Sequence, residues 1–259
     1  MASRSSAEHK LWMRNFHPSS PGAPRLVCLP HAGGSASFYF PVSAALAPEV
    51  EVLAVQYPGR QDRRLDPPAE SVEALADELF SVLDPQDDTP LALFGHSMGA
   101  VVGFELARRL EAAGRPLAVF FASGRRGPSR VRSESVHRRD DAGLLEEIKK
   151  LNGTDLALLD DEEMLQMIMP ALRADYRLVE TYERGPGPRL SCPVVAMTGD
   201  ADPRVTIDEA RSWAEETSGA FELLVHPGGH FYLAPRQRAV NAQIAEYLHR
   251  IAPRTEAQA

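Results

Sequence analysis

Short apolar runs alternate with amphipathic segments along most of this 259-residue chain, and this alternation constrains its fold more than any other feature. A short apolar run suits a parallel strand that is buried on both faces, and an amphipathic segment suits a helix that covers such a sheet. The predicted strands are residues 25–29, 50–57, 91–95, 117–123, 193–198 and 221–225. The predicted helices are residues 38–46, 71–83, 98–113, 207–216 and 236–251. We therefore predict an α/β fold with a mostly parallel central sheet flanked by helices.

The region from residue 124 to residue 190 interrupts this alternation. It contains no strand-like run, but residues 144–151 and 162–182 place apolar side chains at helical spacing, and we expect Pro170 to divide or kink the second helix. Because α/β folds carry their active-site loops at strand ends, we interpret residues 124–190 as a helical lid within a single domain of residues 1–259. The chain ends, residues 1–10 and 253–259, are predicted to be disordered.

The composition restricts the partners and the location of the protein. Its formal net charge of -8 argues against binding a polyanion such as nucleic acid. The sequence has no run of about 18 apolar residues and no apolar stretch near its polar N-terminus, so we predict a cytoplasmic protein without a membrane span. Cys28 and Cys192 lie in or beside strand-like runs, which indicates buried, reduced thiols rather than a disulfide or a metal site.

The pentapeptide Gly95-His96-Ser97-Met98-Gly99 joins a predicted strand to a predicted helix. In a nucleophile elbow the central serine occupies a strained strand-to-helix corner, and the two flanking glycines let strand and helix approach closely. Such pentapeptides also occur by chance, so the alternative is a purely structural Gly-Ser turn. The strand before and the helix after the motif favour Ser97 as a catalytic nucleophile.

A serine nucleophile needs a base to accept its proton and an acid to orient that base. In α/β hydrolases these follow the serine in loops after later strands, the acid before the histidine. The loop after residues 193–198 offers Asp200 and Asp202, and we favour Asp202 because it lies farther out, whereas Asp200 suits a role in bracing the turn. The loop after residues 221–225 offers His226 and His230, and we favour His230 because it lies beyond two glycines.

Acyl transfer also needs two backbone N–H groups that stabilise the oxyanion. We assign one to Met98, which follows the nucleophile, and the other to Ala32 in the glycine-rich loop of residues 30–35. A phosphate-binding role for this loop is the alternative, but the loop has neither a P-loop lysine nor a GxGxxG pattern. The chemistry requires no metal and no redox cofactor, so we predict none.

Six short sequence blocks occur along the chain in an order that is specific to one protein family. They are Leu29-Pro30-His31-Ala32-Gly33-Gly34, Tyr57-Pro58-Gly59-Arg60, Gly95-His96-Ser97-Met98-Gly99, Leu172-Arg173-Ala174-Asp175, Gly199-Asp200-Ala201-Asp202 and Gly228-Gly229-His230-Phe231. From about residue 16 to residue 251, the chain resembles the type II thioesterases of modular polyketide and nonribosomal peptide synthases. The resemblance implies an α/β-hydrolase fold and an editing enzyme that removes stalled or misprimed acyl groups from the phosphopantetheine arm of a carrier protein. It also implies the catalytic set Ser97, Asp202, His230, Ala32 and Met98.

The implied partner, an acyl or peptidyl carrier protein, is usually acidic around its modified serine. Residues 125–139 carry six arginines against the single acid Glu134, so we interpret them as a docking surface, with a solvated loop as the alternative. We expect a monomer. Two other functions fit the same motifs: a thioesterase that releases medium-chain fatty acids from acyl carrier protein, and a generic serine esterase.

Overall fold

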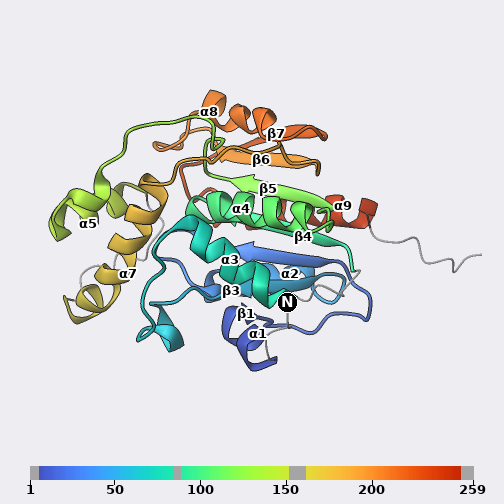
Figure 1. Cartoon of the computed structure of the whole chain (residues 1–259), viewed down its shortest axis with the longest axis horizontal. Helices are drawn as coiled ribbons and strands as arrows, with labels where there is room; N and C mark the ends of the chain where they lie inside the picture. The colour runs from blue at the N-terminus through green and yellow to red at the C-terminus, as the bar shows by residue number, and fades with distance from the viewer. Residues whose placement is uncertain (1–5, 84–88, 152–161, 252–259) are drawn as a thin grey trace, which may run out of the picture.

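The computed structural model describes residues 6–83, 89–151 and 162–251. Among these residues a seven-stranded sheet runs through the centre of the molecule (Figure 1). Its strands are β1 (Met13–Arg14), β2 (Arg25–Leu29), β3 (Glu51–Val55), β4 (Leu91–His96), β5 (Val119–Ser123), β6 (Val194–Gly199) and β7 (Phe221–His226). They lie in the order β1-β3-β2-β4-β5-β6-β7, and every neighbouring pair is parallel except β1 and β3. The predicted α/β fold with a mostly parallel sheet is confirmed.

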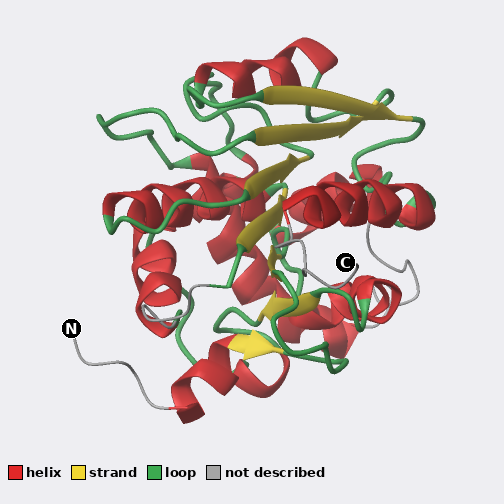
Figure 2. Cartoon of the chain, turned by 90° about the vertical axis from the view of Figure 1, so that its right-hand side faces the viewer, coloured by secondary structure: helices red, strands yellow, loops and turns green. Residues whose placement is uncertain are grey.

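Helices cover both faces of the sheet, as Figure 2 shows from the side. One face packs against α3 (Val72–Val82) and α4 (Met98–Ala112), and the other packs against α2 (Phe40–Leu46) and α9 (Gln237–Ile251). Shorter elements are α1 (Ser6–Trp12), α8 (Ile207–Arg211) and the 3-10 helices η1 (Ala36–Tyr39), η2 (Gln61–Arg63), η3 (Val136–Arg138) and η4 (Ser212–Glu215). The central strands are apolar along their whole length because their side chains alternate between two buried cores.

The parallel register brings the ends of the central strands to one edge of the sheet. Leu29 of β2 pairs with Gly95 of β4, and His96 of β4 pairs with Ser123 of β5. The loops that follow β2, β4 and β5 therefore meet at this edge, which is where parallel α/β sheets bind their ligands.

The chain between β5 and β6 carries α5 (Asp141–Leu151) and α7 (Glu162–Glu180), which lie beyond the carboxyl ends of the strands (Figure 1). These two helices and η3 share a small apolar cluster of their own. Helix α7 continues through Pro170 as one helix, so the first alternative, a division at this residue, is wrong, and the second, a kink, stays a prediction. The lid role of residues 124–190 stays a prediction.

Three further expectations need correction or fall outside the described residues. Residues 6–10 belong to α1, which is attached to the core through a 2.9 Å contact between His9 Nδ1 and the Val82 carbonyl, so the prediction of disorder is wrong there. The predicted helix 207–216 is α8 followed by η4. Residues 1–5 and 253–259 lie outside the described residues.

Within the described ranges, no helix is both long enough and apolar enough to cross a membrane.

Candidate active site

Ser97 occupies a strained corner between β4 and α4. Its φ of 55° lies in the left-handed region, which costs a non-glycine residue on the order of 1–3 kcal/mol. The corner is held by the Ser97 N–H, which donates to the Ser123 carbonyl at 2.8 Å. A Cβ atom on Gly95 would lie 2.2 Å from the Gly99 carbonyl oxygen, and one on Gly99 would lie 2.0 Å from the Leu29 carbonyl oxygen. Both glycines are therefore required by close backbone approach, as expected for a nucleophile elbow.

His230 and Asp202 form a buried hydrogen-bonded pair. His230 Nδ1 lies 2.8 Å from Asp202 Oδ2, and their side chains are 3% and 0% exposed. The second carboxylate oxygen, Oδ1, accepts the backbone N–H of Arg204 at 2.8 Å, which fixes the orientation of the carboxylate. With its Nδ1 proton donated to Asp202, the imidazole presents Nε2 as the basic nitrogen. The His230 ring lies 5.0 Å from the ring of His96, the residue that precedes Ser97.

The two rejected alternatives serve structural roles. Asp200 Oδ1 accepts the backbone N–H of Gly228 at 2.9 Å, so it braces the loop that carries His230. His226 stacks on Tyr232 with ring centroids 4.9 Å apart and an interplanar angle of 10°. The catalytic roles of Asp202 and His230 stay predictions.

Two further histidines, His31 and His96, lie near His230 and are neutral at pH 7. His96 Nδ1 contacts the Ser123 hydroxyl at 2.9 Å, and burial lowers the pKa of His96 well below its usual value. His31 lies between the rings of Phe38 and Phe231, each 4.7 Å away, and burial together with the nearby His230 lowers the pKa of His31 to about 3. Neither imidazole adds a positive charge beside His230 at neutral pH.

The two predicted oxyanion donors lie on adjoining segments. Met98 is the first residue of α4, so its N–H has no acceptor within the helix. Ala32 lies in the loop after β2, and the start of this loop, at Leu29 and Pro30, is in close backbone contact with Gly99. The structure thus brings together the segments on which the sequence analysis placed Ala32 and Met98.

A buried ion pair holds the glycine-rich loop of residues 30–35, which we call the oxyanion loop after its predicted role, and no role was predicted for this ion pair from the sequence. Asp175 of α7 accepts the backbone N–H of Gly33 at 2.7 Å and pairs with Arg60, which also donates to the Gly34 carbonyl at 3.1 Å. Burial raises the pKa of Asp175, while Arg60 and the Gly33 N–H oppose this rise. Helix α7 is thereby tied to the residue after Ala32. Arg60 and Asp175 each end one of the six sequence blocks that resemble the type II thioesterases. This position was the one signal in the sequence that could have pointed to a role for the pair.

An apolar cavity of about 80 Å³ lies between the oxyanion loop and helices α5 and α7. On the side of the sheet it is lined by His31, Ala32, Gly33 and Phe231. The helices contribute Ile148, Leu151, Ile168, Leu172 and Tyr176. The cavity therefore extends from Ala32, a predicted oxyanion donor, to the apolar side chains of α5 and α7.

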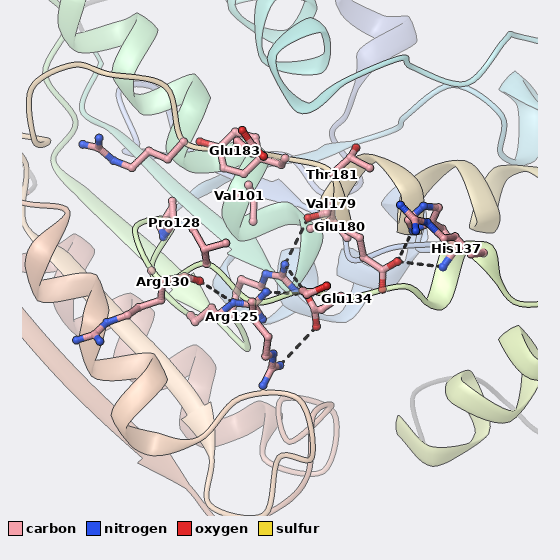
Figure 3. A pocket seen from close by; sticks show the side chains of 18 residues that line it. Val101, Arg125, Pro128, Arg130, Glu134, His137, Val179, Glu180, Thr181 and Glu183 are labelled. Atoms are coloured by element: carbon pink, nitrogen blue, oxygen red, sulfur yellow. Dashed lines mark hydrogen bonds and ion pairs between the residues drawn. The ribbon is translucent and has the colours of Figure 1, made fainter.

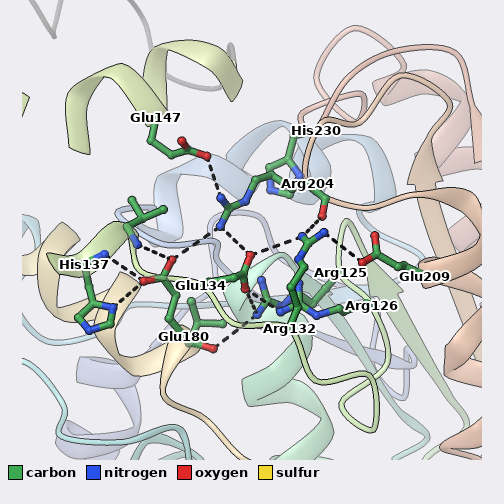
Figure 4. Close-up of polar contacts among 12 residues, drawn as sticks. Arg125, Arg126, Arg132, Glu134, His137, Glu147, Glu180, Arg204, Glu209 and His230 are labelled. Atoms are coloured by element: carbon green, nitrogen blue, oxygen red, sulfur yellow. Dashed lines mark hydrogen bonds and ion pairs between the residues drawn. The ribbon is translucent and has the colours of Figure 1, made fainter. Parts of the chain in front are cut away.

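The arginine-rich residues 125–139 do not form an unpaired basic face. Arg125 and Arg126 are buried and share Glu134, at 3.2 Å and 2.7 Å (Figure 4). Arg130 and Arg132 are more exposed, but they pair with Glu215 and Glu209 of the neighbouring η4 and α8. The docking role stays a prediction, and much of the local charge is already balanced within the chain.

The two cysteines take no part in this site. Cys28 and Cys192 are buried free thiols, as predicted, and burial raises the pKa of each. Among the described residues, no cluster of three or more His, Cys, Asp or Glu side chains has an arrangement that could hold a metal. The lack of a cofactor, the cytoplasmic location and the monomeric state stay predictions.

A parallel sheet with a nucleophile elbow after its central strand defines an α/β hydrolase. A family model described as "Thioesterase domain" matches residues 24–251. The chain belongs to this thioesterase family and is a hydrolase that acts on thioesters.

Relatives with known names support this assignment. The chain is 52% identical over 238 residues to the "Probable cadicidin biosynthesis thioesterase" of Streptomyces griseus, covering 92% of this chain and 66% of the relative. It is 48% identical to "Thioesterase PikA5" of Streptomyces venezuelae, covering 92% of this chain and 85% of the relative. Among solved structures, the type II thioesterase BorB from the borrelidin biosynthetic cluster is 53% identical with a TM-score of 0.87, covering 92% of this chain and 98% of that chain.

Proposed function

We propose that this enzyme removes stalled or aberrant acyl groups from the phosphopantetheine arm of acyl or peptidyl carrier proteins in a polyketide or nonribosomal peptide pathway. The observation that carries the catalytic part is the buried Asp202–His230 pair beside the strained corner of Ser97. The assignment to such a pathway is supported by similar proteins of known structure. BorB is a type II thioesterase from the borrelidin biosynthetic cluster, and YbtT is a type II thioesterase from the yersiniabactin pathway, which contains nonribosomal peptide and polyketide synthases.

In the proposed mechanism, Ser97 Oγ attacks the thioester carbonyl while His230 Nε2 accepts the hydroxyl proton. The backbone N–H groups of Ala32 and Met98 stabilise the oxyanion, and Asp202 stabilises the imidazolium. The carbon–sulfur bond then breaks, and the imidazolium gives its proton to the thiolate, which leaves an acyl ester on Ser97. Water attacks this ester with His230 again as base, releases the carboxylic acid and restores the serine.

We further infer that residues 124–190 act as a lid over the acyl group. The apolar cavity between α5, α7 and the oxyanion loop supports this role, because it lies next to Ala32 and is lined largely by aliphatic and aromatic side chains. An acyl chain placed there would have its carbonyl near the donors and its tail against the helices.

The test measures the release of acyl groups from loaded carrier proteins, with intact-protein mass spectrometry as the readout. Carrier proteins loaded with acetyl, propionyl and medium-chain groups should lose them with the wild type, while Ser97→Ala should lower kcat by several orders of magnitude with the fold intact. Ser20→Ala, at an exposed serine far along the chain from the elbow, is the control. Full activity of Ser97→Ala would refute the mechanism. Release of medium-chain groups alone would favour the fatty-acid function, and faster cleavage of oxygen esters would favour a generic esterase.

A further inference from the structure

Ser123, the last residue of β5, contacts both of the segments that carry the proposed nucleophile and base. Its backbone carbonyl accepts the N–H of Ser97 at 2.8 Å. Its hydroxyl oxygen lies 2.9 Å from His96 Nδ1 and 2.7 Å from the Tyr232 hydroxyl oxygen. His96 precedes Ser97 in the elbow, and Tyr232 follows His230 by two residues. One residue of β5 is therefore hydrogen-bonded to both sides of the proposed active site.

The side chains of Ser123, His96 and Tyr232 are almost completely buried, so solvent has little access to the contacts between them. A hydroxyl group has one proton to donate and two lone pairs that accept, so Ser123 can bind both partners at once. Burial raises the pKa of Tyr232 and lowers the pKa of His96, so both groups are uncharged at pH 7. The three side chains thus form a neutral hydrogen-bonded chain from one segment to the other.

The loop that carries His230 is held on either side of this residue. Two residues before it, the Gly228 N–H donates to Asp200 Oδ1 at 2.9 Å. Two residues after it, the Tyr232 hydroxyl contacts the Ser123 hydroxyl. The first contact holds the loop against the segment after β6, and the second holds it against β5 and thereby against the elbow.

The chain directly after β5 is held in place by contacts with distant segments. The Gly124 N–H donates to the Met197 carbonyl of β6 at 2.9 Å. The Arg125 carbonyl accepts the indole N–H of Trp213 at 2.7 Å, and the Arg125 side chain contacts Glu134 at 3.2 Å (Figure 3). The end of β5 is therefore a firm support for groups that bind to it.

The His96 ring also lies against the proposed base. The His96 and His230 rings are 5.0 Å apart, with an interplanar angle of 43°. A Cβ atom on Gly124 would lie 2.5 Å from the His96 ring and 3.4 Å from the His230 ring, so both rings pack closely on the chain at this residue. In such close packing, a shift of His96 would disturb the position of His230.

We propose that Ser123 and Tyr232 are positioning residues that set the distance between Ser97 Oγ and His230 Nε2. The inference rests on the proposed function, since it takes Ser97 as the nucleophile and His230 as the base. Ser123 acts through its contacts with His96 and with the Ser97 backbone, and Tyr232 acts through the loop of His230. Proton transfer between serine and histidine requires a distance of about 2.6–3.2 Å, and a displacement of about 1 Å can lower a rate about 100-fold.

The first test removes the Ser123 hydroxyl and keeps the backbone carbonyl. Ser123→Ala should lower kcat for propionyl-N-acetylcysteamine about tenfold to a hundredfold. It should change KM less than about threefold, because the variant displaces the base and removes no contact with the substrate. Inactivation by phenylmethylsulfonyl fluoride, a reagent that reacts with activated serines, should slow by a similar factor. Unfolding in urea identifies any variant that fails to fold.

Ser43→Ala is the matched control for this substitution. Ser43 of α2 is also a buried serine, and its hydroxyl contacts a histidine nitrogen, His17 Nδ1, at 3.1 Å. Loss of this hydroxyl should lower the stability in urea without changing kcat or the rate of inactivation. A general effect of removing a buried hydroxyl group is thereby separated from an effect on the base.

A double variant tests whether Tyr232 acts through Ser123. Tyr232→Phe should lower kcat about threefold to tenfold, as for the loss of one hydrogen bond, because the contact between Ser123 and His96 remains. When Tyr232→Phe is added to Ser123→Ala, kcat should change less than about threefold further, since their shared contact is already lost. Tyr232→Phe also keeps the proposal testable if Ser123→Ala does not fold.

Three results would overturn the positioning role. They are a wild-type kcat in folded Ser123→Ala, equal effects of Ser123→Ala and Ser43→Ala on kcat, and losses from Ser123→Ala and Tyr232→Phe that multiply independently. The proposed function is tested separately, because full activity of Ser97→Ala would refute it whatever the Ser123 variants show.

Discussion

Asp175 connects helix α7 to the oxyanion loop, and replacing it should affect both stability and catalysis. Its carboxylate is 4% exposed and its partner Arg60 is 7% exposed, so Asp175→Ala leaves a buried guanidinium without its counter-charge. Loss of one partner from such a pair costs about 3–5 kcal/mol in the free energy of unfolding. The same change releases the Gly33 N–H, one residue after the proposed donor Ala32. Removing an oxyanion donor lowers kcat by about 100- to 1000-fold, which sets the upper limit for displacing one.

A comparison of two substitutions separates these effects. Asp175→Asn retains an oxygen that can accept the Gly33 N–H, so it should lose stability but keep most of its kcat. Asp175→Ala loses both contacts, and its kcat should fall about tenfold or more below that of Asp175→Asn. Urea unfolding gives the stability, and hydrolysis of propionyl-N-acetylcysteamine gives kcat. Arg177→Gln, an exposed position on the same helix, is the control. Equal kcat values for folded Asp175→Ala and wild type would refute the link between α7 and the oxyanion loop.

Two further predictions concern the elbow and the arginine cluster. Gly99→Ala places a methyl group 2.0 Å from the Leu29 carbonyl oxygen. The variant should therefore have a free energy of unfolding that is lower by about 1–3 kcal/mol or more, and a reduced kcat. Wild-type values of both quantities would contradict the close packing of Gly99 against Leu29. Burial opposes the ionisation of Glu134, but Arg125 and Arg126 lower its pKa to about 2. Because this folded-state pKa is below the usual value of 4.5, the stabilisation is present above pH 4.5 and is lost as pH falls toward 2. Urea unfolding should therefore show Glu134→Gln to be less stable than wild type at pH 6.5, with a gap that narrows at pH 3; a constant gap would contradict the ionic origin.

Local patterns in the sequence predicted most of the fold. A strand that is buried on both faces is apolar along most of its length, so β2, β4, β5 and β6 were recognisable, and the bounds of β4, β5 and β6 shifted by only one or two residues. The edge strand β7 was also recognised from its apolar residues, although it is only partly buried. Strand β1 was missed because two residues carry no periodicity. The break expected at Pro170 did not occur because a local propensity can be overridden by packing, here of Met169 and Leu172 in the cluster below α7.

The catalytic candidates were predictable for a related reason. Each lies in the turn or loop that follows a strand, and in a parallel sheet the ends of the strands meet at one edge. Chain order therefore indicated which loops carry the candidates, and position within each loop favoured Asp202 over Asp200 and His230 over His226. The structure adds the 2.8 Å contact between Asp202 and His230 and the bracing role of Asp200.

The sequence by itself thus determined the sheet, the elbow and the order of the candidate catalytic residues, because these follow from local periodicity and from glycine spacing. Only the tertiary structure decided which distant charges meet. Arg60 and Asp175 are 115 positions apart, and nothing local predicts that they pair beneath the oxyanion loop. The arginines of residues 125–139 appeared in the sequence as a solvent-exposed run, yet Arg125 and Arg126 are buried around Glu134. Whether a charge is balanced depends on long-range packing, and composition records only that the charge is present.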